Sequence, residues 1–232
     1  MGFESMNRRR FLTVSAAAAG ASLGSGLLPQ AAWAKPISIV LRNINAFTMG
    51  VRKVNPQATV QLIFTGDWSM PVREAEATNS LIASRCDVIA CHVDSPKVVI
   101  EAAEKQGVKT LGHNASQASL APKGFITGAE NKWETVYKTF AADIGQGKKL
   151  PNQFFGGYDK DMVTSTPFGA GATDKARNAA LAAIADLKAG KPIYAGPVSG
   201  NTGKVVIDKA LGNYDPVLDR MNFLVEGVIG SV

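Results

Sequence analysis

Polar and aromatic side chains follow three predicted strands at the points where those strands end. The strands cover residues 60–66, 87–93 and 109–114, and the side chains at their ends are Asp67, Trp68, His92, Asp94, His113 and Asn114. In open parallel sheets, ligands bind outside the carboxyl ends of the strands. We therefore expect these side chains to share one edge of a sheet and to form the candidate site.

Trp68 is the most distinctive of these residues, because a large aromatic ring follows a strand where the chain should turn in solvent. An indole offers a flat surface on which a planar ring can stack. Trp68 could equally pack under a loop as part of a satellite core, and the sequence leaves both interpretations open. Asp94 has a simpler explanation beside its functional one, since a carboxylate at a predicted helix start can cap that helix.

Neither metal binding nor catalysis is indicated. His92 and His113 are the only histidines, and no third ligand stands at a recognised spacing, so ordinary surface or core histidines are favoured. The chain has no Gly-x-Ser-x-Gly elbow, no phosphate-cradling glycine loop after a strand and no Cys-His pair. We predict no catalytic residue, no metal site and no cofactor.

Strand and helix patterns alternate around these positions. Helices are predicted over 69–85 and 95–107, with Ser69 and Ser95 as caps, and another helix covers 39–56 before the first strand. Further along, a short strand covers 125–131, and helices cover 132–147 and 173–191. Consecutive βαβ units predict an α/β fold with a parallel sheet flanked by helices.

The N-terminus resembles a twin-arginine secretion signal over residues 1–34. Arg8 and Arg9 precede Phe11 and Leu12, a weakly apolar Ala/Gly segment follows, and a small-x-small cleavage site closes at Ala34. This pattern predicts a periplasmic protein, exported by the twin-arginine pathway and peripheral to the inner membrane. The formal net charge is +6, but the basic residues are scattered and form no stripe with aromatics, so we predict no nucleic-acid partner.

One set of residues lies between positions 45 and 96, namely Asn45-Ala46-Phe47, Gly50, Asn55-Pro56, Thr65-Gly66, Trp68, Asp87-Val88-Ile89, His92 and Asp94-Ser95-Pro96. The segment MNFLVEGV at 221–228 belongs with them. As an ensemble these residues resemble the Bmp (basic membrane protein, PnrA-like) family of ABC-transporter substrate-binding proteins. The resemblance covers nearly all of residues 37–232.

This resemblance implies a type I periplasmic-binding-protein lobe that delivers purine bases or nucleosides to an ABC permease in the inner membrane. In the family, an aromatic after the Thr-Gly pair stacks on the base, and that position is Trp68 here. Asn114 stands where the family carries a ligand-binding Asp, which favours a base over a ribose. The implied ligand-binding residues are Asp67, Trp68, Asp94, Asn114, Asn131 and Trp133. Trp133 could equally be a core residue of an amphipathic helix.

The sequence departs from the family's pattern at its start. Family members carry most of a first lobe before the helix that contains Asn45. Here the predicted signal runs almost directly into that helix. Residues 37–40 resemble the remainder of the last strand of the first lobe. We expect residues 35–114 to form the first part of the core lobe, 115–150 a hinge crossing with a remnant of the other, incomplete lobe, and 151–232 the return to the core lobe and a C-terminal segment. An exported α/β enzyme using Asp67, His92 and Asp94, or a truncated paralogue that binds nothing, are the alternatives.

Overall fold

A seven-stranded sheet forms the centre of the computed structural model, which describes residues 10–15 and 34–232. Its strand order is β6-β5-β4-β3-β1-β2-β9. The strands are, in chain order, β1 (Arg10–Ser15), β2 (Thr59–Phe64), β3 (Val88–His92), β4 (Lys109–Asn114), β5 (Phe125–Asn131), β6 (Val163–Ser165) and β9 (Val228–Ile229). Every pairing is parallel except that of β6, which runs antiparallel to β5 at one edge.

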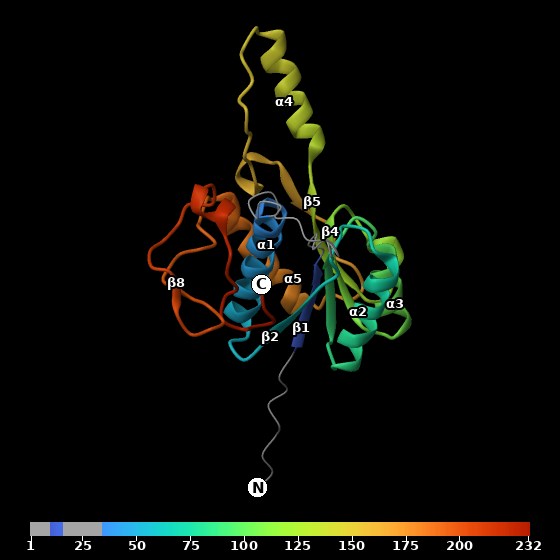
Figure 1. Ribbon diagram of the computed structural model, residues 1–232. Helices are drawn as coiled ribbons and strands as arrows, with labels where there is room; N and C mark the ends of the chain where they lie inside the picture. The colour runs from blue at the N-terminus through green and yellow to red at the C-terminus, as the bar shows by residue number, and fades with distance from the viewer. Residues whose placement is uncertain (1–9, 16–33) are drawn as a thin grey trace, which may run out of the picture.

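Helices cover both faces of this sheet (Figure 1). The helices α2 (Pro71–Ala83) and α3 (Lys97–Lys105) lie on one face, and α1 (Ala34–Val54) and α5 (Asp174–Lys188) lie on the other. This arrangement confirms the predicted α/β class, because each parallel strand pair needs a crossover and the crossover helices pack on the sheet. The architecture is consistent with a periplasmic-binding-protein fold.

The C-terminal residues build a smaller layer outside α1. It contains a two-stranded sheet of β7 (Val198–Ser199) and β8 (Val205–Ile207) and the 3-10 helix η4 (Pro216–Arg220). There are two further 3-10 turns. The turn η2 (Ala118–Leu120) follows β4, and η3 (Tyr158–Lys160) precedes β6. The chain then returns to the main sheet, where β9 pairs with β2.

Two hydrophobic clusters hold the layers together. One lies between the sheet and α2/α3 and includes Leu81, Ile89 and Ile100, all fully buried. The other joins α1 to the C-terminal layer through Leu41 and Leu218, among others. Half-buried Trp68 packs against both clusters, so the predicted site begins where the two meet.

The buried amide of Asn45 connects α1 to the C-terminal layer. Its nitrogen donates to the Phe223 carbonyl at 2.8 Å, and its oxygen accepts from the Val225 N–H at 3.0 Å. The same nitrogen lies 2.9 Å from the Met221 sulfur. One residue of the Asn-Ala-Phe motif therefore satisfies buried backbone groups about 180 positions away in the chain.

Three sequence predictions need correction, namely the strand remainder at residues 37–40 and the two serine caps. Residues 37–40 are not a strand remainder but part of α1, because Val40, Leu41 and Ile44 are buried at helical spacing. Ser69 and Ser95 do not cap their helices: their hydroxyl oxygens lie 2.7 Å apart and bond each other across the ends of β2 and β3. The predicted start of α2 near Pro71 is confirmed, with Pro71 in its first turn.

Strand β1 falls inside the predicted signal peptide. Residues 10–15 pair with β2 on one side and β3 on the other, in the middle of the sheet. The rest of that segment, residues 1–9 and 16–33, lies outside the described residues. The export signal itself stays a prediction.

Helix α4 (Trp133–Gly145) projects from the body of the molecule (Figure 1). None of its residues is buried, although it carries Trp133, Tyr137 and Phe140. The segment that returns from it contributes Phe154, whose ring meets Phe140 with centroids 5.1 Å apart. Helix α4 of this projecting arm falls within the predicted hinge crossing at 115–150, whereas Phe154 lies just after it, and the role as a hinge stays a prediction.

Candidate functional site

A row of aromatic rings lies at the carboxyl edge of the parallel strands. Trp68 follows β2, His92 ends β3 and His113 lies one residue before the end of β4. The ring centroids of Trp68 and His92 are 5.4 Å apart, and those of His92 and His113 are 4.3 Å apart. The sheet therefore brings together three of the residues that the sequence placed at strand ends.

A hydrogen-bonded turn fixes Trp68 in this row. Gly66 adopts a φ of +95°, a conformation that glycine permits without steric cost, and the Asp67 carboxylate accepts the Trp68 N–H at 2.6 Å. The Trp68 carbonyl accepts the Asp94 N–H at 2.7 Å, which ties the end of β2 to the end of β3. The exposed carboxylate of Asp67 thus orders the turn that carries Trp68.

The start of α2 contains a buried acid that sequence reasoning missed. Glu74 is fully buried, and its Oε1 accepts the Met70 N–H at 2.7 Å, whereas its Oε2 has no hydrogen-bond partner. Burial raises the pKa of this carboxyl, against the lowering effect of the Met70 hydrogen bond, and the nearby Asp94 carboxylate raises it further. Glu74 satisfies a backbone donor in the first turn of α2, so its role is structural.

The two histidines are held neutral. Burial lowers the pKa of His92, and burial followed by the proximity of His92 lowers the pKa of His113 to about 4. The side-chain amide of Asn43 on α1 lies 3.5 Å from His92 Nδ1, so a donating amide N–H leaves the His92 proton on Nε2. A neutral imidazole pair can both donate and accept hydrogen bonds, and it adds no net charge to the site.

Asn114 and Asn131 meet at the ends of neighbouring strands. The Asn131 amide donates to the Asn114 side-chain oxygen at 3.3 Å, and both side chains are exposed. Asn114 has a φ of +66°, a turn conformation that asparagine tolerates better than most residues. Both amides are therefore available at the same edge as the aromatic row.

Trp133 and Asp94 are both exposed, and neither side chain has the structural role that the sequence left open for it. Trp133 is 57% exposed at the start of the projecting arm, and its ring contact is with Tyr137, at 6.1 Å between centroids. It is not a core residue, which removes that interpretation. Asp94 is exposed, and α3 begins at Lys97 without a side-chain cap, so Asp94 does not cap that helix.

A cavity of about 350 Å³ lies behind the histidine pair, between the sheet and the helices α1 and α5. His92 and His113 line it, whereas none of the six predicted ligand-binding residues does. The sequence analysis placed both histidines at the shared edge but did not include them among the ligand-binding residues. Their positions at the ends of two consecutive predicted strands were the signal that could have added them.

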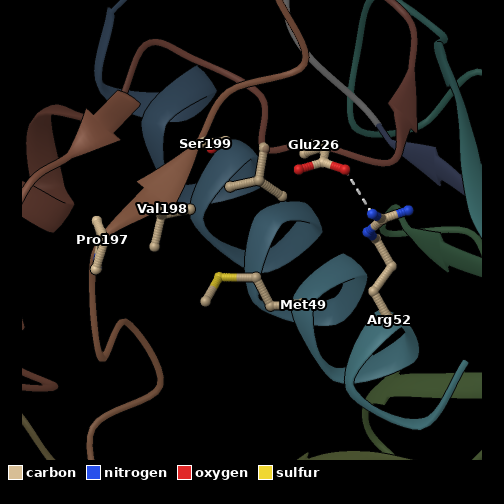
Figure 2. A pocket seen from close by; sticks show the side chains of 7 residues that line it. Met49, Arg52, Pro197, Val198, Ser199 and Glu226 are labelled. Carbon is tan, nitrogen blue, oxygen red and sulfur yellow. Dashed lines mark hydrogen bonds and ion pairs between the residues drawn. The ribbon is translucent and has the colours of Figure 1, made fainter. Parts of the chain in front are cut away.

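A second hollow, of about 300 Å³, lies at the other end of the strands (Figure 2). Met49 and Arg52 of α1 face the segment Pro197–Ser199 across it, and Glu226 pairs with Arg52 at 2.7 Å. Arg52 also donates to the Ala58 carbonyl, just before β2 begins. This hollow is therefore far along the strands from the aromatic row, at the edge where parallel sheets do not place ligands.

The described residues contain no group of three or more His, Cys, Asp or Glu side chains that could hold a metal ion. In the same parts of the chain, none of the helices combines the length and hydropathy that crossing a bilayer requires.

The open parallel sheet, with an aromatic row at its carboxyl edge, has the arrangement of a ligand-binding lobe. The chain belongs to the PnrA-like family of ABC transporter substrate-binding proteins (Bmp), which matches residues 4–176.

Two curated relatives can be compared with this chain. A purine-binding protein of Brucella abortus is 28% identical over 83% of this chain and 55% of its own length. A putative ABC transporter glucose-binding protein of Haloferax volcanii is 36% identical over 57% of this chain and 32% of its own length. The chain thus spans about half or less of the curated relatives it matches.

The structural neighbours share the fold. An ABC transporter solute-binding protein from Conexibacter woesei superposes with a TM-score of 0.59 at 18% identity, over 80% of this chain and 57% of its own. A transcriptional activator of the comK gene from Bacillus halodurans superposes with a TM-score of 0.63 at 18% identity, over 79% and 58% of the two chains.

Proposed function

We propose that this chain is the extracytoplasmic solute-binding component of an ABC importer and that it binds a purine base or nucleoside for an inner-membrane permease. Export by the twin-arginine pathway is part of the same proposal. The observation that carries it is the half-buried Trp68 ring at the carboxyl edge of the sheet, 5.4 Å from His92. An indole held at that edge can stack on a flat heterocycle.

Polar groups around Trp68 support a ligand with hydrogen-bonding edges. The paired amides of Asn114 and Asn131 are exposed at the same edge, and each amide can donate and accept. We assign Asp94 a contact to a ligand N–H, since its carboxylate is exposed beside the Trp68 backbone. Asp67 orders the turn, and Trp133 covers the ligand from the projecting arm. The curated relative named for purine binding supports this substrate class.

The test is a set of thermal melts of the full chain with adenine, adenosine and glucose. A ligand present at 100 times its dissociation constant stabilises the fold by about 2.7 kcal/mol, which raises the melting temperature by several degrees. We expect a shift with adenine or adenosine. A shift with glucose alone would overturn the purine assignment, and no shift with any of the three would overturn ligand binding at this edge.

Two variants separate stacking from simple packing. Trp68→Leu keeps an apolar side chain between the two clusters but removes the aromatic plane, whereas Trp68→Phe keeps a plane. We expect the adenine shift to disappear in Trp68→Leu and to persist, reduced, in Trp68→Phe. Equal shifts in both variants would show that Trp68 does not stack on the ligand.

A further inference from the structure

The cavity behind the histidine pair has an apolar floor and apolar helical walls. Ala90, Leu111 and Thr127, on three neighbouring strands, form the floor. Phe47 of α1 and Ile184 and Leu187 of α5 face them from the helices. This space is partly open to solvent, since Asn43 and Ala183 among its lining residues are exposed, and its lining does not include Trp68, Asn114 or Asn131 of the exposed edge.

The cavity exists because α5 stands off the sheet. Its residues that face the space include Ala180 and Ala183, whose side chains are too short to reach the strands, and no residue of α5 is fully buried. On the opposite face, α3 buries Val99, Ile100 and Ala103 completely against the same strands. The face of the sheet under α5 is therefore packed less tightly than the face under α3, and it leaves room for a small molecule.

Polar groups line two sides of the cavity. His92 and His113 line one side, with the Asn43 amide beside them. On the far side, the Tyr158 hydroxyl lies 2.6 Å from the Ser165 hydroxyl, so this pair offers a donor and an acceptor. Among the described residues that line the cavity, none carries an Asp, Glu, Lys or Arg side chain.

We propose that this cavity is a second small-molecule site, and that it takes an uncharged, planar heteroaromatic compound. Its volume of about 350 Å³ falls at the lower end of the range of about 300 to 1,000 Å³ that is typical of small-ligand pockets. The apolar floor and walls suit a flat ring, and the imidazole and hydroxyl pairs suit ring nitrogens or an exocyclic N–H. A phosphate or carboxylate group is disfavoured, because none of the described lining residues offers it a cationic partner.

The probe for this site is benzimidazole, with adenosine monophosphate as the charged comparison. Untagged full-length protein has two histidines, so the NMR signals of its imidazole rings report on His92 and His113 alone. We expect benzimidazole to shift the ring signals of both histidines and to raise the melting temperature. Adenosine monophosphate should not bind in the cavity, so it should not shift the NMR signal of either histidine by that route.

The matched variants are Ala180→Leu, which fills the cavity from α5, and Ala179→Leu, which adds the same side chain on the exposed side of the same helix. Ala180→Leu should leave the free protein at least as stable as the parent and weaken benzimidazole binding at least tenfold. Ala179→Leu should bind as the parent does. Equal binding by both variants, or no histidine shift in the parent, would overturn the second site.

Trp68→Leu distinguishes the two proposals. Benzimidazole binding that survives Trp68→Leu supports the cavity site, whatever adenine does at the exposed edge. Benzimidazole binding that is lost in Trp68→Leu but retained in Ala180→Leu would place the compound at the edge and overturn the cavity site alone. An adenine shift that is absent from the parent protein, with the benzimidazole response intact, would overturn the purine transport proposal alone.

Discussion

The imidazole rings of His92 and His113 meet edge to face, with their centroids 4.3 Å apart, on neighbouring strands of the sheet. Ala90 of β3 pairs with Leu111 of β4. His92 and His113 each follow two residues later, so they lie at the same height and on the same face of the sheet. The pair forms the boundary between the edge that carries Trp68 and the cavity under α5. Both proposed sites therefore depend on this single contact between β3 and β4.

Acid should destabilise the protein through these histidines. Burial lowers the pKa of His113 from 6.5 to about 4, and the pKa of His92 is lowered as well. Between these pH values the unfolded chain binds more protons than the folded one, so the free energy of unfolding falls as the pH drops. Cys91 does not titrate in this range, because burial raises the pKa of its thiol to about 12.

We expect His113 to account for about 1 to 2 kcal/mol of the stability lost between pH 7 and pH 5. Urea unfolding of the parent and of His113→Gln at both pH values measures this contribution. The His113→Gln variant should show a smaller loss on acidification than the parent. Equal losses in the two proteins would mean that His113 is not held neutral by its surroundings.

Replacing Asn45 with Ala should destabilise the protein by about 3 kcal/mol. The change leaves the Phe223 carbonyl and the Val225 N–H without their side-chain partner in a buried position, and each unsatisfied group costs about 1 to 3 kcal/mol. Asn43→Ala, two residues away and exposed, is the control and should change stability by less than about 0.5 kcal/mol. Similar midpoints of urea unfolding for the two variants would contradict the assigned role of Asn45.

Two glycine substitutions should act in opposite directions. A Cβ at Gly128 would lie 2.8 Å from backbone atoms of Gly112, so Gly128→Ala should force β4 and β5 apart and cost about 1 to 3 kcal/mol. A Cβ at Gly50, inside α1, meets nothing within 4 Å, so Gly50→Ala should stabilise the protein by about 0.5 to 1 kcal/mol. Thermal melts compare both variants with the parent, and a stabilised Gly128→Ala would refute the close approach of β4 and β5.

Removal of residues 1–34 should cost much of the fold's stability, because β1 pairs with β2 and β3 on its two sides. Without it, the two inner edges of the sheet lose their hydrogen-bond partners. Urea unfolding of the full chain and of a chain that begins at Lys35 measures the effect. A large loss would overturn cleavage after Ala34, whereas equal stability of the two chains would show that β1 is dispensable, as that cleavage requires.

The sequence by itself determined the local structure. The alternation of apolar strands with helices that start near prolines predicted β2, α2, β3, α3 and β4 in order, since the hydrophobic period and proline placement are properties of short segments. It also placed Trp68 directly after β2 and a histidine near the end of each of the next two strands. The same local signals failed at residues 37–40, where an apolar run in a helix resembles a strand.

The tertiary structure decided which of these side chains meet. The 4.3 Å contact of the histidines comes from the pairing of β3 with β4 and its register, which the pattern within either strand does not specify. The cavity lies between α5, α1 and four strands that come from distant parts of the chain, so no single segment of the sequence specifies it. The exposure of Trp133 on the projecting arm, which an amphipathic pattern alone could not foresee, follows from the absence of a covering element among the described residues.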